Sequence, residues 1–198
     1  MSVAEVKSCQ IVALQGAASN VIQALLMEIA ATLIARGLRV VGVVENSNSG
    51  PNPCKSMELR SFDDGRIFSI SQNLGPGSQA CNLHPEGIAL ACAAVQESIS
   101  HGADVVILSK FGKQEALGSG LNDAFGAAIA AGIPIITSVS PAMMDHWRKF
   151  AGELAECVTA DSANCDSWLD QWSRNIVTGQ PMRDMMGSPL AGSHQYGR

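Results

Sequence analysis

The sequence is short of the features that accompany nucleic-acid binding, membrane insertion and secretion. Lysine and arginine number 13 together, against 18 aspartates and glutamates, which gives a formal net charge of -5. A nucleic-acid partner requires clustered basic side chains that neutralise phosphates, so we expect none. No apolar run reaches the length of about 18 residues that a spanning helix needs, and the first residues lack the apolar core of a signal peptide. We therefore expect no membrane span and a cytoplasmic protein.

Paired cysteines are also missing. The six cysteines are scattered and form no CxxC pair; they are Cys9, Cys54, Cys81, Cys92, Cys157 and Cys165. In a reducing compartment this spacing indicates free thiols rather than a disulfide framework. Cys92 lies inside an alanine-rich helical pattern, and Cys9 lies beside an apolar run. We expect both to be small residues of the core.

A phosphate-binding loop begins near the N-terminus but is not completed. An apolar run at 10–15 is followed by a glycine turn and a long helical pattern, which is how a P-loop opens. The P-loop pattern GxxxxGK[ST] would place a glycine, a lysine and a hydroxyl where this chain has Val21, Ile22 and Gln23. The lysine that reaches the phosphates and the hydroxyl that binds the metal are both absent from this frame.

A second absence agrees with the first. Nucleotide hydrolases of this architecture carry an acidic residue near Mg²⁺ at the end of a neighbouring strand. Here the apolar run 104–109 ends in Ser109 and is followed by Lys110. Both departures disfavour hydrolysis of ATP.

What the sequence does contain is an alternation of strand and helix patterns. Strands are expected at 10–15, 38–44, 104–109, 133–139 and 156–159, and helices at 20–36, 86–100, 121–131, 143–152 and 166–178. This alternation predicts a parallel sheet with right-handed crossovers. The segments MELRSF and RIFSIS, separated by DDG, predict an inserted antiparallel hairpin. We therefore expect an α/β three-layer sandwich with a mainly parallel sheet, like that of P-loop nucleoside-triphosphatases.

One globular domain is expected. A chain of 198 residues that is 46% hydrophobic can bury one sizeable core. We assign 1–179 to a single α/β domain. Residues 180–198 hold three glycines, two prolines and little apolar periodicity, which indicates a flexible C-terminal tail.

The predicted topology also places a candidate site. In open parallel sheets, ligands bind beyond the carboxyl ends of the strands, where loops and helix N-termini meet. Three segments are expected to face one another there, namely 15–20, 72–85 and 110–120. We predict that they surround one electropositive hollow.

The first segment contributes Gly16, Ser19 and Asn20 ahead of a helix. Free backbone N–H groups at a helix N-terminus can hold an anion without any lysine. Ser19 or Asn20 could equally be an N-cap of that helix. The sequence leaves both interpretations open.

The second segment contributes Gly77, Ser78, Cys81 and His84. Glycines allow unusual backbone angles and a close approach to a ligand. Cys81 and His84 have a C-x-x-H spacing that supplies two metal ligands, but zinc sites usually take three or four from the protein. Three interpretations stay open: a metal site, a thiol and an imidazole that line an anion pocket, and a structural loop. We assign no metal site.

The third segment, KFGKQEALGSG, contributes Lys110, Lys113, Glu115, Ser119 and Gly120. It directly follows a buried strand, so both lysines are expected at the ligand edge, and the glycine-rich turn offers further N–H groups. Solvated surface lysines are the alternative. The carboxylate of Glu115 could hold a metal-bound water or pair with either lysine.

Several longer stretches resemble a known family. These are ISQNLGPGSQACNLHPEG, SKFGKQEALGSGLNDAFGAAIAAGIPIITSV and WRKFAGELA, and the resemblance covers about 10–152. They are similar to a bacterial domain-of-unknown-function family that is encoded near molybdenum ABC transporter genes. That family is distantly similar to P-loop nucleoside-triphosphatases and generally lacks an intact P-loop. The resemblance implies a link to molybdate or molybdenum homeostasis, by association rather than by mechanism.

Three functions are compatible with these patterns. The first is a non-hydrolysing protein that binds a small anionic ligand, either a nucleotide or a molybdate-type oxyanion. The second is a divergent nucleoside-triphosphatase or phosphotransferase, in which Lys110 or Lys113 replaces the missing lysine and Glu115 the metal carboxylate. The third is a scaffold or regulatory partner of a transport system. We favour the first, assign no catalytic residue and no cofactor, and leave a homo-oligomer open.

Overall fold

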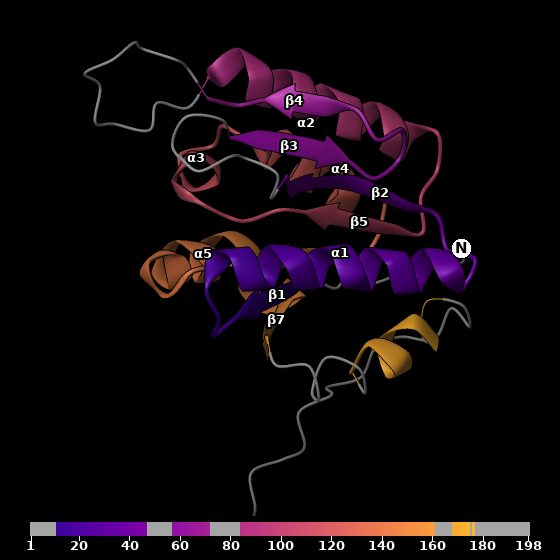
Figure 1. Cartoon of the computed structure of the whole chain (residues 1–198). Helices are drawn as coiled ribbons and strands as arrows, with labels where there is room; N and C mark the ends of the chain where they lie inside the picture. The colour runs from indigo at the N-terminus through magenta and orange to yellow at the C-terminus, as the bar shows by residue number, and fades with distance from the viewer. Residues whose placement is uncertain (1–10, 47–56, 72–83, 161–167, 175, 177–198) are drawn as a thin grey trace, which may run out of the picture.

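The computed structural model describes residues 11–46, 57–71, 84–160, 168–174 and 176. Within them, helices pack against both faces of a seven-stranded sheet (Figure 1). The strands are β1 (Ile11–Gln15), β2 (Val40–Glu45), β3 (Glu58–Ser61), β4 (Ile67–Ser69), β5 (Val105–Leu108), β6 (Ile135–Ser138) and β7 (Ala155–Thr159). The helices are α1 (Ser19–Ala35), α2 (Pro85–Ser100), α3 (Lys113–Ala116), α4 (Asn122–Ala130) and α5 (Met144–Ala151), with the short 3-10 helices η1 (Pro141–Met143) and η2 (Gly152–Leu154). Residues 168–174 and 176 are also helical.

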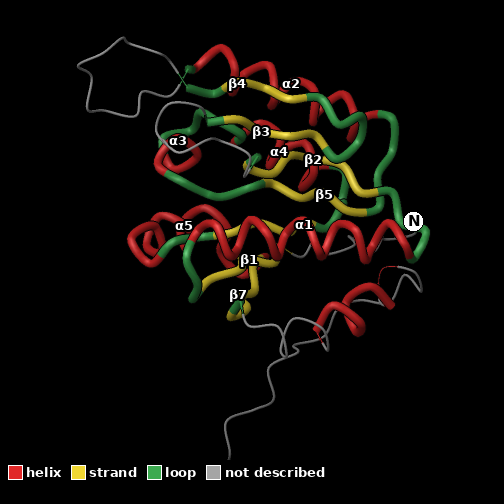
Figure 2. Tube along the Cα trace, in the orientation of Figure 1, coloured by secondary structure: helices red, strands yellow, loops and turns green. Residues whose placement is uncertain are grey.

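The sheet has the strand order β4-β3-β2-β5-β6-β1-β7. The five strands from β2 to β7 in this order are parallel, and β3 runs antiparallel to both of its neighbours. Every residue of β5 and β6 is buried, as expected for parallel strands covered by helices on both faces. Figure 2 shows the alternation of strands and helices along the chain. The predicted fold class, an α/β sandwich with a mainly parallel sheet and an inserted hairpin, is confirmed.

The hairpin of β3 and β4 forms around the predicted Asp-Gly turn. The carboxylate of Asp64 accepts the backbone N–H of Arg66 at 3.0 Å and two guanidinium hydrogen bonds at 2.9 and 2.7 Å. The backbone hydrogen bond, followed by the side-chain ones, lowers the pKa of Asp64 to about 2. Gly65 has a φ of 72°, the left-handed conformation that glycine adopts at little cost. The turn therefore stabilises itself with local contacts.

The two faces of the sheet carry different cores. The face covered by α2, α4 and α5 is rich in phenylalanine, and the rings of Phe111 and Trp147 lie 5.1 Å apart between centroids. The opposite face is covered by α1 and by the helical residues 168–174. There the rings of Trp168 and Trp172 lie 5.4 Å apart. Each face thus has its own aromatic cluster.

The expected elements and the observed ones differ mainly in the segment after β5. The sequence predicted a loop there, whereas the structure has the short helix α3. Cys92 is 5% exposed, which confirms it as a core residue, and burial raises the pKa of its thiol. The expected core residue Cys9, the tail at 180–198 and most of the glycine-rich loop at 72–85 lie outside the described residues. Among those described, no helix is both long and apolar enough to cross a membrane.

Candidate functional site

The turn between β1 and α1 is the first of the predicted segments. Gly16 has a φ of 88°, and the helix begins at Ser19 with Ala18 at the N-cap position. The first helical hydrogen bond runs from Ile22 N to Ala18 O at 3.0 Å, so the N–H groups before Ile22 have no partner within the helix. Ser19 and Asn20 lie in the first turn, and no side chain caps the helix. The interpretation of either residue as the N-cap is therefore wrong.

Gln23 of α1 connects the carboxyl ends of β5 and β2. Its side chain is 2% exposed; Nε2 donates to the carbonyl oxygen of Ser109 at 2.9 Å, and Oε1 accepts the backbone N–H of Glu45 at 3.0 Å. The hydroxyl of Ser138, at the end of β6, donates to the same Ser109 oxygen at 2.8 Å. Three neighbouring strand ends are thereby linked through buried polar groups.

Lys110 lies at this edge of the sheet, next to the end of β2. Its ammonium forms an ion pair with the carboxylate of Glu45, and the two side chains are 46% and 26% exposed. The backbone of Glu45 is the group that Gln23 holds. Lys110 is therefore at the predicted edge, but with an acidic partner from another strand. Lys113 is exposed at the first position of α3.

Glu115 has a different role from the one expected. It is 8% exposed, and its two carboxylate oxygens accept the backbone N–H groups of Gly112 and Leu121, each at 2.9 Å. These hydrogen bonds replace the expected contact with Lys110 or Lys113. Gly120 takes a φ of 66°, and a Cβ there would lie 2.2 Å from the Glu115 carboxylate. The carboxylate thus holds the segment from α3 to α4 in shape.

Of the remaining predicted site residues, the structure describes Ser119 and His84. Ser119 Oγ lies 3.0 Å from the carbonyl oxygen and 2.7 Å from the side-chain Oε1 of Gln114. His84 is the N-cap of α2, where its Nδ1 accepts the N–H of Gly87 at 3.1 Å. The three predicted residues of the glycine-rich loop, Gly77, Ser78 and Cys81, lie outside the described residues. Among the residues that are described, no group of three or more potential metal ligands occurs.

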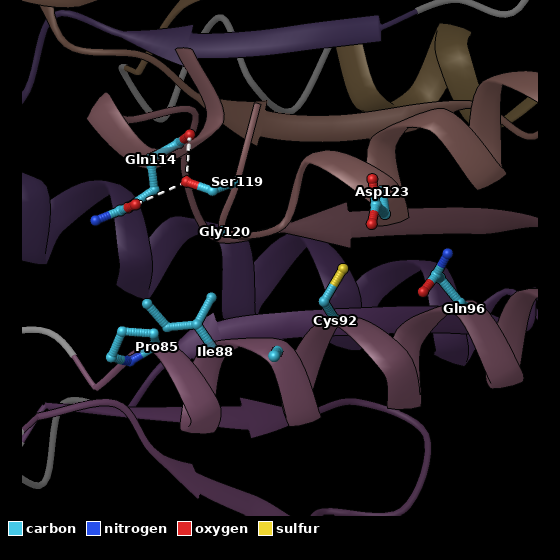
Figure 3. A pocket seen from close by; sticks show the side chains of 9 residues that line it. Pro85, Ile88, Cys92, Gln96, Gln114, Ser119, Gly120 and Asp123 are labelled. Atoms are coloured by element: carbon cyan, nitrogen blue, oxygen red, sulfur yellow. Dashed lines mark hydrogen bonds between the residues drawn. The ribbon is translucent and has the colours of Figure 1, made fainter. Parts of the chain in front are cut away.

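A hollow of about 310 Å³ lies between α2 and the segment from α3 to α4 (Figure 3). Its lining residues are Pro85, Ile88, Ala89, Cys92, Gln96, Gln114, Ser119, Gly120 and Asp123. Asp123 is the one charged residue in this set, so the lining is not electropositive. The helices around it cover the face of the sheet opposite to α1. This hollow does not match the prediction, because it includes neither the turn after β1 nor the two lysines.

Sequence reasoning missed Gln23, the polar residue that links the ends of β5 and β2. Gln23 was interpreted only as a lost hydroxyl, although it is a polar residue on the buried face of α1, close to Ile22 and Leu26. A buried polar side chain normally needs hydrogen-bond partners, and that requirement is the signal that could have identified it. Its partners could not be named, because they depend on which strands become neighbours.

Comparison with known proteins gives this geometry a context. The molybdenum import ATP-binding protein ModC 2 of Bradyrhizobium diazoefficiens is 35% identical over 145 residues, which make up 73% of this chain and 16% of that protein. The chain thus spans about a sixth of this curated relative's length. A solved structure of a human cancer-related nucleoside triphosphatase has a similar fold, with a TM-score of 0.60 and 14% identity over 89% of this chain and 100% of that one. Residues 11–168 match the family described as protein of unknown function DUF2478, and the chain belongs to that family.

Proposed function

We propose that this protein binds a nucleotide phosphate or a tetrahedral oxyanion such as molybdate at the carboxyl edge of its sheet, without hydrolysis. The observation that carries the proposal is the position of Gln23. Gln23 stands where a P-loop has the serine or threonine whose hydroxyl binds magnesium. Here the nitrogen and the oxygen of its side-chain amide are both hydrogen-bonded to backbone groups at the strand ends.

Two further positions argue against hydrolysis. Ile22 of α1 stands where a P-loop has the lysine that contacts the phosphates. It is 6% exposed and packs in the core between α1 and the sheet. The end of β5 carries Ser109 and Lys110, where a hydrolase would place a carboxylate near the metal. Phosphoryl transfer depends on positioned positive charge and metal, so these substitutions remove its main contributions.

The same edge keeps features that suit anion binding. The uncapped first turn of α1 presents N–H groups after the left-handed Gly16, and Lys110 supplies a positive charge at the end of β5. The relative from Bradyrhizobium carries ATP binding and molybdenum import in its name. This supports a nucleotide or a molybdenum oxyanion as the ligand.

Thermal-shift measurements with ATP, GTP, molybdate, tungstate and sulfate test the proposal. A ligand of the folded state raises the apparent melting temperature, and we expect Lys110→Ala to reduce that shift while Lys149→Ala, on the exposed surface of α5, leaves it unchanged. Release of phosphate from Mg-ATP or Mg-GTP that is lost in Lys110→Ala would instead favour the divergent triphosphatase. If none of these anions raises the melting temperature, the scaffold role is favoured and the binding function is wrong.

A further inference from the structure

The residues at this edge of the sheet are poorly suited to bind Mg²⁺, the metal that accompanies nucleotides in P-loop folds. Magnesium is held by hard oxygen ligands, including the P-loop hydroxyl and a carboxylate at the end of a neighbouring strand. In this chain the hydroxyl position is Gln23, which is 2% exposed and whose Oε1 already accepts the N–H of Glu45. Releasing that oxygen for a metal would leave the partly buried backbone N–H of Glu45 without this partner.

The nearby carboxylate is also engaged. Glu45 forms an ion pair with Lys110, so its negative charge is already balanced by an ammonium group. A divalent cation at this carboxylate would have to displace Lys110 and would lie close to its positive charge. The residues that line this edge therefore favour a fixed cation of the protein over a metal ion.

We propose that the ligand binds in its metal-free form, with the ammonium of Lys110 supplying the positive charge that a magnesium ion supplies in related folds. Gln23 is a positioning residue in this scheme. It fixes the backbone of Glu45, and a side-chain oxygen of Glu45 in turn accepts a hydrogen bond from Lys110 at the strand ends. This inference rests on the proposed function, and it adds a selection for the free anion over its magnesium complex.

The selection follows from charge. Magnesium bound to a polyphosphate neutralises part of the negative charge that Lys110 would recognise. It also brings a second cation close to an ammonium group, which is unfavourable at short distance. Added magnesium should therefore weaken the binding of a polyphosphate, whereas a site built for a magnesium complex would show the opposite.

Isothermal titration calorimetry with ATP as the probe, in EDTA and in excess MgCl₂ at matched ionic strength, tests this inference. A molybdate titration in the same two buffers is run in parallel. We expect ATP to bind more tightly in EDTA than in magnesium, and molybdate to bind equally in both. Binding of ATP that appears only with magnesium would overturn this inference and leave the binding function intact. Absence of binding for ATP and molybdate in both buffers would overturn the proposed function as well.

Variants separate a direct contact from a loss of structure. Lys110→Ala should weaken ATP or molybdate binding about tenfold or more, with no recovery in magnesium, and Lys110→Arg should restore most of it. Gln23→Met keeps the length of the side chain but removes both hydrogen bonds. If Gln23 acts through Lys110, Gln23→Met should weaken binding in the wild-type background and add little in Lys110→Ala. Equal losses in both backgrounds, in folded protein, would contradict the positioning role.

Discussion

The turn after β1 and the segment after β5 both lead from a buried strand into a helix. They differ in whether a side chain accepts hydrogen bonds from their backbone N–H groups. After β1, Ala18 is the N-cap, and no side chain accepts from the first turn of α1. After β5, the carboxylate of Glu115 accepts from Gly112 and from Leu121. The first turn leaves donors available to a ligand, and the second satisfies its donors internally.

This difference separates two segments that each contain glycine and each lead from a strand into a helix. Both were expected to supply N–H groups to an anion. In the segment after β5, Glu115 and Gly120 maintain the conformation of the backbone, whereas Lys110 lies partly exposed at the end of the strand. Under the proposed function, the backbone donors of the site therefore come from the turn after β1 and its positive charge comes from Lys110.

Removing the carboxylate of Glu115 should have the largest effect on stability. Glu115→Ala leaves two backbone N–H groups without their acceptor, and we expect it to lower the free energy of unfolding by about 4 kcal/mol. Urea denaturation followed by circular dichroism measures this change. Glu153→Ala, at an exposed position of η2, is the matched control and should change stability little. A Glu115→Ala variant as stable as the wild type would show that the segment is not organised by this carboxylate.

The two left-handed glycines of the same segment provide a second test. Gly118 and Gly120 have φ angles of 74° and 66°, but a Cβ at Gly118 meets no atom within 4 Å. Gly118→Ala should cost about 1 kcal/mol for the backbone alone. Gly120→Ala should cost about 3 kcal/mol, because its Cβ would lie 2.2 Å from Glu115 Oε1 and 2.8 Å from the Cβ of Gln114. Denaturation midpoints of both variants give the difference. That difference should shrink in a Glu115→Ala background, where only the contact with Gln114 remains. A difference of unchanged size there would exclude Glu115 as a cause.

A hydrogen-bond acceptor added to the turn after β1 should satisfy its N–H groups, as Glu115 does in the segment after β5. Ala18→Asp places a carboxylate at the N-cap of α1, where it can accept the N–H groups of the first turn, and should stabilise the protein by about 1 kcal/mol. The same carboxylate should reduce or abolish the thermal shift with anions. An Ala18→Asp protein that is more stable and still binds ATP or molybdate normally would exclude this turn from the site.

The smallest expected effect concerns the acidic partner of Lys110. Glu45→Gln removes a negative charge close to the proposed anion but keeps a side-chain oxygen for the ammonium group. Because partly exposed ion pairs contribute about 1 kcal/mol or less, anion affinity should rise about threefold. Calorimetry with ATP or molybdate measures it, with Asp145→Asn on α5 as a control of equal charge change. An affinity that falls would mean that the charge of Glu45 is needed to hold Lys110 in place.

The sequence predicted the sheet, the hairpin and most helices because their signals are local. Alternating apolar runs and the DDG turn depend on neighbours along the chain, and the strands and the hairpin formed where these patterns predicted them. The hydrogen bond between Gln23 and Ser109 joins residues 86 positions apart, and its geometry depends on β5 and β2 becoming neighbours. The helix α3 was missed for a related reason, since four residues carry little periodicity and its shape depends on Glu115.

The distribution of tryptophans gives the protein a built-in optical reporter for each side of its sheet. The chain has three, with Trp147 in one core and Trp168 and Trp172 in the other. Replacing Trp147 by phenylalanine confines the indole emission to the side that carries α1, and replacing the other two confines it to the far side. Loosening of either layer can then be followed separately during unfolding, without attaching any external dye.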